Sequence, residues 1–535
     1  MVGVSGHNRI GVERSGGRSG RIALKKTASK ADVVRAGMTG GNFLPLKEQD
    51  LKKIHHAALE ILETIGVAEA TPEVVMLATE KGCVVKENGR LCFPSAVIED
   101  VLSQAANEYY VHSRSSEHSD LQVGGYRVHY ATSGEAVTVF DVHSRSYRPS
   151  TLHDLYDSCR LADRMEYIHQ YGQTVVPTEI KDLDEHDLNV AYALVAGTEK
   201  PFEMTFNHAR NIRPTIEMFE MVQGRTGSFA KKPFCTFGGC PIVSPLRFAK
   251  DSLDILVETS RLGLINDIAI APQAGATAPV TLAGTLAQVT AEGLACLAIV
   301  NFIKPKCPMS FAIWPFISDL RTGAFSGGSG EEAIIVSAAV QIGKYYNLPT
   351  TVPSCMTDSK IPDAQSGYEK GISAVLAGLA GGNRILESAG MLASLLGFSY
   401  EALVIDNDML GMVQRVIRGI EVTDETLSVE VIREVVLGEG HFLGHSQTLE
   451  RMQSEFLYPN ISDRSSPGIW EEEGSKDILD HAHKRVWEIL SSHYPDHLDH
   501  DLDNRIRERY PILLPRDSMK SSDRWNIKDH RPLRI

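Results

Sequence analysis

The chain has 535 residues, of which 43% are hydrophobic and 23% are charged, and its formal net charge is −14. This composition is typical of a globular enzyme, and the negative charge argues against a nucleic-acid-binding protein. We expect neither a secretory signal nor a membrane-spanning segment. The eight cysteines form no CxxC pair, which favours reduced thiols in a cytoplasmic protein.

The first 150 residues predict a tail and a small domain. Residues 1–38 hold eight Lys or Arg and two Asp or Glu among many Gly and Ser, so we predict a disordered basic tail. Residues 39–150 are predicted to form an α+β domain. Its first helix is amphipathic and covers 49–65, and its second starts with Thr71 as N-cap and Pro72 at the first helical position. Strands and hairpins are expected over 109–147.

Eight short apolar runs alternate with helical patterns further along the chain. The runs are 166–176, 201–207, 233–239, 266–272, 308–314, 350–356, 383–389 and 402–406. Alternation of this kind predicts an α/β fold, a (β/α)8 TIM barrel, which we place over 151–423. The helices are predicted near 184–197, 214–222, 245–262, 282–302, 331–346, 368–380 and 390–396. A helical region over 424–515 and a polar tail over 516–535 follow.

Barrels of this kind place their active site at the C-terminal ends of the strands, and three features stand out there. The first is a set of aromatic residues, which are Tyr171, Phe206, Phe237, Phe311, Trp314 and Phe316. Such a set could bind a quaternary ammonium group through cation–π attraction, or it could fill the barrel interior. The second is the glycine-rich stretch 325–332, which could hold an anion or act as a hinge. The third is the loop 357–365, rich in charged and amide side chains.

No metal motif is complete in this sequence. His441 and His445 are four residues apart, but the Glu of an HExxH motif is absent and Gly444 weakens the helix. Cys235 and Cys240 flank two glycines, which suggests close backbone approach more than thiolate ligation. We therefore expect no metal site, although a zinc-dependent methyltransferase stays an alternative.

Three segments resemble one family. They are residues 357–371 (Thr-Asp-Ser-Lys-Ile-Pro-Asp-Ala-Gln-Ser-Gly-Tyr-Glu-Lys-Gly), 440–445 (Gly-His-Phe-Leu-Gly-His) and 447–452 (Gln-Thr-Leu-Glu-Arg-Met). Together with the fifth predicted strand, they resemble the trimethylamine methyltransferase family over about residues 39–515. The resemblance implies a (β/α)8 barrel that moves a methyl group from an amine to cob(I)alamin, a corrinoid cofactor carried by a partner corrinoid protein.

The resemblance also indicates a substrate class. Trimethylamine enzymes carry pyrrolysine in a loop that we match to 357–365, at or beside Ile361, whereas this chain has only ordinary residues there. We therefore expect a small quaternary amine, such as glycine betaine, as the methyl donor. Two alternatives stay open: a tertiary-amine methyltransferase without pyrrolysine, and a non-catalytic betaine-binding barrel. We also expect a homo-oligomer with no nucleic-acid or membrane partner.

We assign candidate roles to residues in the strand-end loops, in line with the chemistry that the resemblance implies. Catalytic candidates are Glu387, Asp358 and Gln365. Candidates for substrate binding are Tyr171, Gln173, Phe206, Asn207, His208, Trp314, Phe316 and Lys360. Candidates for meeting the corrinoid are Gly327, Gly328, Ser329, Asp363 and Ile361.

Overall fold

The computed structural model describes residues 33–521, 523–526 and 533. Most of the predicted basic tail lies outside these residues. The chain forms two compact units: residues 421–458 belong to one, and residues 34–420 and 459–535 belong to the other, which we call the main unit. The domain boundaries expected at 38, 150, 423 and 515 stay predictions.

The N-terminal part of the main unit is built as its sequence pattern predicts. Helix α2 (Glu48–Glu60) runs into a π-helical turn, η1 (Ile61–Ile65), so the chain is helical to the residue expected. Thr71 caps α3 (Pro72–Glu80), because its side-chain oxygen accepts a hydrogen bond from the backbone N–H of Val74. Helix α4 (Ser95–Gln104) and the hairpins β2 (Val84–Val85) with β3 (Leu91–Cys92) and β4 (Glu108–Val111) with β5 (Leu121–Gly124) complete this part.

Parallel strands form the centre of the main unit. One ladder contains β9 (Tyr171–Gly172), β10 (Phe202–Thr205), β11 (Cys235–Gly239) and β14 (Asn266–Ile268). The other contains β18 (Thr351–Pro353), β19 (Arg384–Leu386) and β6 (Arg127–Tyr130). Isolated parallel bridges join the ladders: Ala131 with Gln170, Asn266 with Met309, Ile270 with Ile313, and Phe311 with Thr350. The fold is therefore a mixed α/β fold in which continuous ladders alone do not close a ring.

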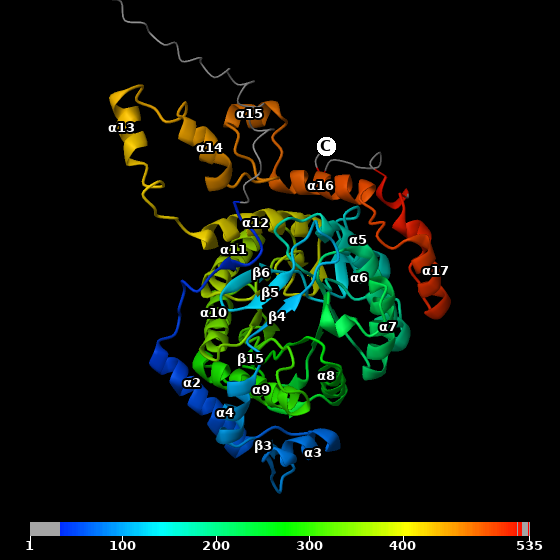
Figure 1. Ribbon diagram of the computed structural model, residues 1–535. Helices are drawn as coiled ribbons and strands as arrows, with labels where there is room; N and C mark the ends of the chain where they lie inside the picture. The colour runs from blue at the N-terminus through cyan, green and yellow to red at the C-terminus, as the bar shows by residue number, and fades with distance from the viewer. Residues whose placement is uncertain (1–32, 522, 527–532, 534–535) are drawn as a thin grey trace, which may run out of the picture. The chain divides into compact units, whose positions relative to one another are not determined.

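Helices alternate with these strands and lie around them (Figure 1). They are α5 (Leu152–Asp163), α6 (Leu183–Gly197), α7 (Ile212–Gln223), α8 (Lys250–Leu262), α9 (Leu282–Ile303), α10 (Gly330–Tyr345), α11 (Ala364–Ala380) and α12 (Tyr400–Arg418). Against our expectation, α9 is long and apolar enough to cross a membrane. However, 89% of its most apolar window is buried, and it packs against α2, α3, α4, α8 and α10, so it is a core helix.

Two predicted elements are wrong, and a third, the strand over 308–314, is formed only in part. Residues 402–406 lie in α12, whose N-cap Ser399 accepts a hydrogen bond from the backbone N–H of Ala402. Residues 390–396 form no helix but a hairpin of β20 (Met391–Leu392) and β21 (Gly397–Phe398). Residues 308–314 pair only through isolated bridges. In place of the eighth predicted strand, β6 pairs with β19, although its sequence Arg-Val-His-Tyr is too short and polar to be recognised as a buried strand.

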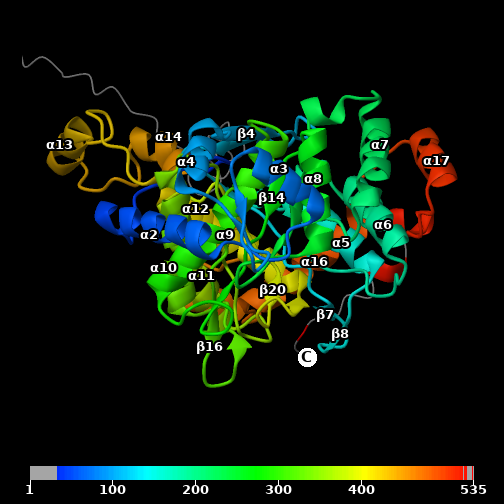
Figure 2. The ribbon, with the colours of Figure 1, turned by 90° about the horizontal axis from the view of Figure 1, so that it is seen from below.

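Smaller strands connect these elements. They are β1 (Met38–Thr39), β7 (Thr138–Phe140), β8 (Tyr147–Pro149), β12 (Ile242–Val243), β13 (Arg247–Phe248), β15 (Gln273–Ala274), β16 (Phe316–Asp319) and β17 (Ala324–Phe325). Figure 2 shows that the loop between β16 and β17 stands out from the main unit as a narrow hairpin.

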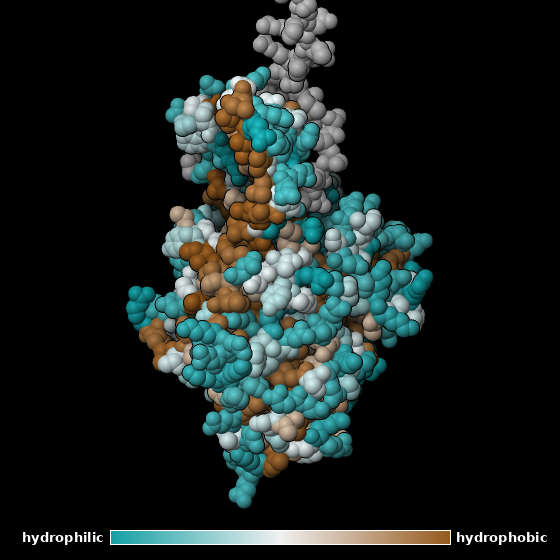
Figure 3. Space-filling model, turned by 60° about the vertical axis from the view of Figure 1, so that its left-hand side comes forward, coloured by the Kyte–Doolittle hydropathy of each residue, from teal (hydrophilic) through white to brown (hydrophobic). Residues whose placement is uncertain are grey.

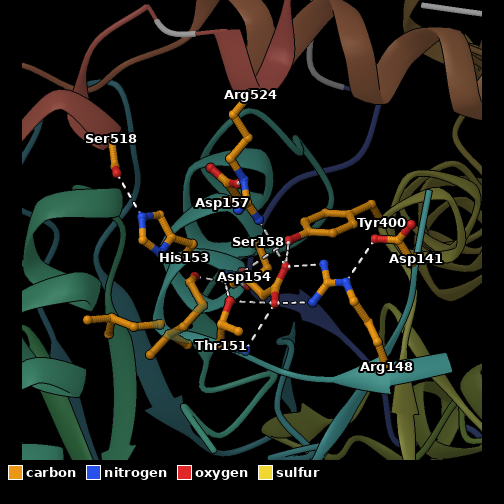
Figure 4. A network of polar contacts seen from close by, with 12 residues as sticks. Asp141, Arg148, Thr151, His153, Asp154, Asp157, Ser158, Tyr400, Ser518 and Arg524 are labelled. Atoms are coloured by element: carbon orange, nitrogen blue, oxygen red, sulfur yellow. Dashed lines mark hydrogen bonds and ion pairs between the residues drawn. The ribbon is translucent and has the colours of Figure 1, made fainter. Parts of the chain in front are cut away.

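The region after α12 is helical, as expected. Its helices are α13 (Val429–Leu437), α14 (Ser446–Glu455), α15 (Pro467–Glu472), α16 (Ile478–Ser492) and α17 (His500–Arg509), followed by the short turns η4 (Arg516–Met519) and η5 (Asp523–Trp525). The segment we expected to be a polar tail is docked through η5. Asp157 on α5 accepts hydrogen bonds from Arg524 Nε at 2.8 Å and from Trp525 Nε1 at 2.7 Å (Figure 4).

Asp157→Ala should destabilise the main unit. Asp157 is buried and also pairs with the buried guanidinium of Arg160 at 2.9 Å, so its loss leaves buried donors without an acceptor, at a cost of about 3–5 kcal/mol. Thermal unfolding followed by circular dichroism should show a lower midpoint than the wild type. Asp501→Asn, at an exposed position on α17, is the control and should leave the midpoint unchanged. An unchanged midpoint in Asp157→Ala would contradict this role.

Candidate functional site

Three carboxylates from three strands come together at the C-terminal ends of the parallel strands. Glu387 follows β19, Glu135 follows β6, and Glu203 lies on β10. A Cβ atom placed on Gly134 would lie 2.7 Å from Glu387 Oε2, so the glycine keeps this oxygen clear. Glu135 accepts a hydrogen bond from the hydroxyl of Thr205 at 2.6 Å, which holds it over the end of β10.

Among the described residues, only Glu203 of these acids forms an ion pair with an Arg or Lys, although His186 acts electrostatically on Glu135. Arg384, fully buried on β19, donates to Glu203 at 2.5 Å and also pairs with the buried Asp267 of β14. One guanidinium therefore pairs with two carboxylates, so its single positive charge does not also neutralise Glu135 or Glu387.

The environment of Glu387 is unusual for an acid. Its side chain is 2% exposed, and Oε2 has no hydrogen-bond partner among the described residues. Burial, together with the charges of Glu203 and Glu135, raises the pKa of Glu387 well above its usual range. Burial likewise raises the pKa of Glu135, with a further contribution from Glu203 and against the hydrogen bond from Thr205. In addition, Glu387 has a φ of 64°, a left-handed conformation that non-glycine residues adopt at a cost.

An apolar layer lies beside these carboxylates. Trp314, Phe316 and Met356 pack together with Leu386 and Ala131, which come from β19 and from the end of β6. The indole N–H of Trp314 donates to the carbonyl of Thr351 at 3.1 Å, and its ring meets that of Phe316 edge-on at 6.3 Å between centroids. Residues from separate strands thus meet in one interior cluster, and one of its members, Leu386, directly precedes Glu387 in the chain.

The loop after β18 is tied to its neighbours. Asp358 accepts hydrogen bonds from the hydroxyl of Ser326 at 2.7 Å, the backbone N–H of Gly327 at 3.0 Å and the hydroxyl of Ser394 at 2.5 Å. Its own backbone N–H donates to Glu369 of α11. One carboxylate therefore joins the loop after β18 to the segments that follow β16 and β19.

The glycine-rich stretch does not form an open cradle. A Cβ atom on Gly327 would lie 2.8 Å from Met356 Cβ, and one on Gly328 would lie 2.3 Å from Glu369 Oε2. Ser329 caps α10 by accepting from the backbone N–H of Glu332. These residues are occupied in packing and capping, so the structure gives no fit between them and a corrinoid.

The other predicted residues divide into two groups. Gln173 lies within the carboxylate site, since its carbonyl accepts from the backbone N–H of Glu135 and its Oε1 is buried without a partner among the described residues. Tyr171 does not, because its hydroxyl bonds to Ser158 of α5 and to Thr174. It therefore faces a helix rather than the aromatic cluster.

The remaining candidates lie apart from Glu387 or near the surface. Phe206 stacks on Phe237 at 5.4 Å, and the backbone N–H groups of Asn207 and His208 donate to Asp187 of α6. Lys360 is exposed and donates to the carbonyl of Asp358 in its own loop, and Ile361 is 46% exposed. Asp363 caps α11 through the backbone N–H of Ser366, and Gln365 donates to Glu369.

Sequence reasoning missed Glu135 and Glu203. Glu135 was assigned to an N-terminal domain because β6 was not recognised as a member of the parallel set. The pattern that could have identified it is the apolar stretch Tyr130–Ala131 followed by Thr-Ser-Gly-Glu, a strand end with a glycine beside an acid. Glu203 was read as part of an apolar strand. No group of three or more His, Cys, Asp or Glu in the described part of the chain is placed to hold a metal ion.

A parallel-stranded α/β fold with buried acids and aromatic rings at its strand ends defines the class of an enzyme with a small-molecule site there. A family model described as trimethylamine methyltransferase (MTTB) matches residues 14–510. The chain belongs to this family, and it is a methyltransferase of it.

Two relatives and one solved structure illustrate the similarity. The trimethylamine methyltransferase MttB of Methanosarcina thermophila is 30% identical over 458 residues, which cover 85% of this chain and 94% of that protein. A glycine betaine methyltransferase of Desulfitobacterium hafniense is 29% identical over 472 residues, covering 87% and 97%. The crystal structure of the Methanosarcina barkeri monomethylamine methyltransferase (MtmB) is 12% identical, with a TM-score of 0.49, and covers 88% of this chain and 92% of that one.

Glu387→Gln should stabilise the protein at neutral pH. Since the folded state raises the pKa of Glu387, the folded chain binds more protons than the unfolded chain, and wild-type stability falls as pH rises above the unfolded pKa. Each unit by which the pKa is raised lowers the free energy of unfolding at high pH by about 1.4 kcal/mol. Glutamine has no proton to lose, so the variant does not pay this penalty. Unfolding midpoints measured from pH 4 to pH 8 should diverge, with the variant above the wild type at pH 8. Parallel curves would contradict a protonated Glu387.

Proposed function

We propose that this protein transfers a methyl group from a small quaternary amine, such as glycine betaine, to cob(I)alamin on a partner corrinoid protein. Family membership supports a corrinoid protein as the partner and an amine as the substrate. We further infer that the eight parallel segments form a (β/α)8 barrel. Their pairings run in cyclic order, from β6 through β9, β10, β11, β14, residues 309–313, β18 and β19 back to β6.

Two observations carry the proposal: Glu387 Oε2 is buried without a hydrogen-bond partner among the described residues, and the preceding residue, Leu386, packs in one cluster with Trp314 and Phe316. A buried carboxylate without a partner is unfavourable unless it is protonated or meets a cation. A methylated ammonium ion offers a positive charge to Glu387 and Glu135 and methyl groups to the aromatic faces. The site thus suits a cation that is apolar on its outside.

The chemistry of a quaternary amine matches what these residues offer. The corrinoid supplies the nucleophile. The leaving amine is neutral, so no residue of the chain has to protonate it. The chain has to position the N–CH₃ group, exclude water and stabilise the positive charge before transfer, which is a task of orientation. In this proposal, Trp314 and Phe316 contact the methyl groups, whereas Glu387 stabilises the positive charge.

A tertiary amine is the second candidate, and the 30% identity to a protein named trimethylamine methyltransferase is the observation that favours it. A tertiary amine must be protonated before it can leave, and a neutral Glu387 carries the proton to do so. One relative at 30% identity is named a trimethylamine methyltransferase, and another at 29% identity is named a glycine betaine methyltransferase.

A methyl-transfer assay separates these candidates. The protein is mixed with cob(I)alamin and either glycine betaine or trimethylamine, and the Co(I) absorption band is followed. We expect loss of the band with glycine betaine and not with trimethylamine. Turnover of trimethylamine alone would establish the second candidate. Calorimetric binding of betaine without transfer, in the presence of a corrinoid protein, would instead indicate a binding protein.

Two substitutions test the binding site itself. Trp314→Ala and Glu387→Gln should each weaken glycine betaine binding, the first by at least several-fold through lost cation–π contact and the second by about tenfold or more. Because a bound cation favours ionised Glu387, wild-type affinity should rise with pH, with proton release in calorimetry. Glu387→Gln should abolish both effects. Tyr171→Phe is the control, since Tyr171 faces α5, and should bind as the wild type does. Equal affinity in all four proteins would refute the site.

A further inference from the structure

Residues 421–458, which we call the arm, contain two helices with large apolar side chains on their surface. Val429, Ile432 and Val436 recur at i, i+3 and i+7 along one face of α13, and they are 58%, 47% and 65% exposed. This spacing is the pattern of a helix that binds through one apolar face. Leu437, Leu443 and Phe456 add to this surface, with exposures of 63–81%.

The arm does not bury these side chains within itself. Among its described residues, α14 has no buried side chain and α13 has only Val435. Its internal side-chain contacts are polar: Arg451 pairs with Glu425, His445 with Glu434, and Gln447 with Ser428. Exposed contacts of this kind contribute about 1 kcal/mol or less each. A segment of 38 residues that leaves these side chains exposed needs another surface to cover them.

The main unit of the same chain carries a second exposed apolar surface. Helices α10, α11 and α12 pack side by side, and Gly371 of α11 faces Met409 of α12. Large apolar side chains point outward from these helices, and we call this set the stripe: Ile334, Tyr368, Ile372, Met412 and Val416. Figure 3 shows hydrophobic residues gathered into continuous areas on the face that it turns to the viewer.

We propose that the arm of one copy binds the stripe of a second copy, so that two chains form a symmetric dimer by exchanging arms. The six arm residues named above expose on the order of 800 Å², which is about what each partner contributes to a standard protein interface. It also exceeds the apolar patch of roughly 300–600 Å² that a typical monomer carries. One sequence supplies both surfaces, so a two-fold axis places each arm on the other chain's stripe and closes the assembly.

The test is the mass of the full-length protein in solution, measured by light scattering during gel filtration at micromolar concentration. The wild type should have twice the chain mass of 58.7 kDa, or a multiple of that dimer. The arm variant Ile432→Asp/Val436→Asp and the stripe variant Ile372→Asp/Val416→Asp should each elute as monomers. Both should keep the circular dichroism spectrum and melting behaviour of the main unit, because all four positions are exposed.

Mixing the two variants gives the sharpest result. The arm variant keeps its stripe and the stripe variant keeps its arm, so together they should form a heterodimer through one intact arm–stripe contact, with at least tenfold weaker affinity than the wild type. A matched control, Leu44→Asp/Val84→Asp, changes two other exposed apolar residues and should stay dimeric.

Three outcomes would overturn the proposal. A monomeric wild type would show that no second copy covers the arm, and so would variants that stay dimeric. The third concerns residues 1–32, which hold seven Lys or Arg against two acids, while the arm holds eight acids against two Arg. If a chain beginning at residue 33 lost the dimer while the arm and stripe variants did not, the basic segment would be the arm's partner.

Discussion

The parallel strands of this protein depend on one buried guanidinium. Arg384 donates through Nε to Gln170, pairs with Glu203 on β10 and pairs with Asp267 on β14. Gln170 in turn donates to Thr236 of β11. The side chain of Arg384 therefore joins its own strand, β19, to three other strand segments, and Gln170 extends the connection to β11. Breaking one partner from such a buried pair costs about 3–5 kcal/mol, so this arrangement fixes the register of the strands whose ends carry the site.

The same arrangement sets the electrostatics of the strand ends. Arg384 pairs with two carboxylates, which already exceed its charge, and neither Glu135 nor Glu387 forms an ion pair with an Arg or Lys of the described residues. The interior thus presents an excess of negative charge to whatever enters from the strand ends. A neutral Glu387 lowers that excess in the free protein, whereas a cationic ligand would compensate it directly. Fold stability and ligand preference consequently depend on the same group of charges.

Much of the fold could be predicted from the sequence, because buried strands and amphipathic helices leave periodic patterns. The Thr71 cap and most of the helices lie where the patterns place them. The exceptions have physical causes. The run 402–406 is apolar because it is the buried start of α12, and a short apolar run does not distinguish a strand from a helix. Strand β6 was missed because the buried His129 interrupts its apolar pattern and its register depends on β19, far along the chain.

The site was predicted in part for the same reason. Strand counting named Glu387, Trp314, Phe316 and Gln173 as candidates. Trp314 and Phe316 pack in one cluster with Leu386, and the carbonyl of Gln173 accepts from the backbone N–H of Glu135, while the roles of all four stay predictions. The prediction for Tyr171 was wrong by one position, because neighbouring strand residues point to opposite sides of the strand. The preceding residue, Gln170, is the one that contacts Arg384. Glu135 could not be found without knowing which strand precedes it. The glycines at 327 and 328 are explained by close packing, which sequence alone does not separate from ligand binding.

The attachment of η5 to α5 has a consequence for how the protein is made. Arg524 and Trp525 follow Asp157 by 367 and 368 residues along the chain, so they are synthesised long after the helix that they bind. During synthesis, Arg160 holds Asp157 and Arg148 holds Asp154, so α5 can form with its acids already paired. The contacts of η5 with α5 require synthesis through Trp525, so they are added after the acids of α5 have found their partners on neighbouring residues.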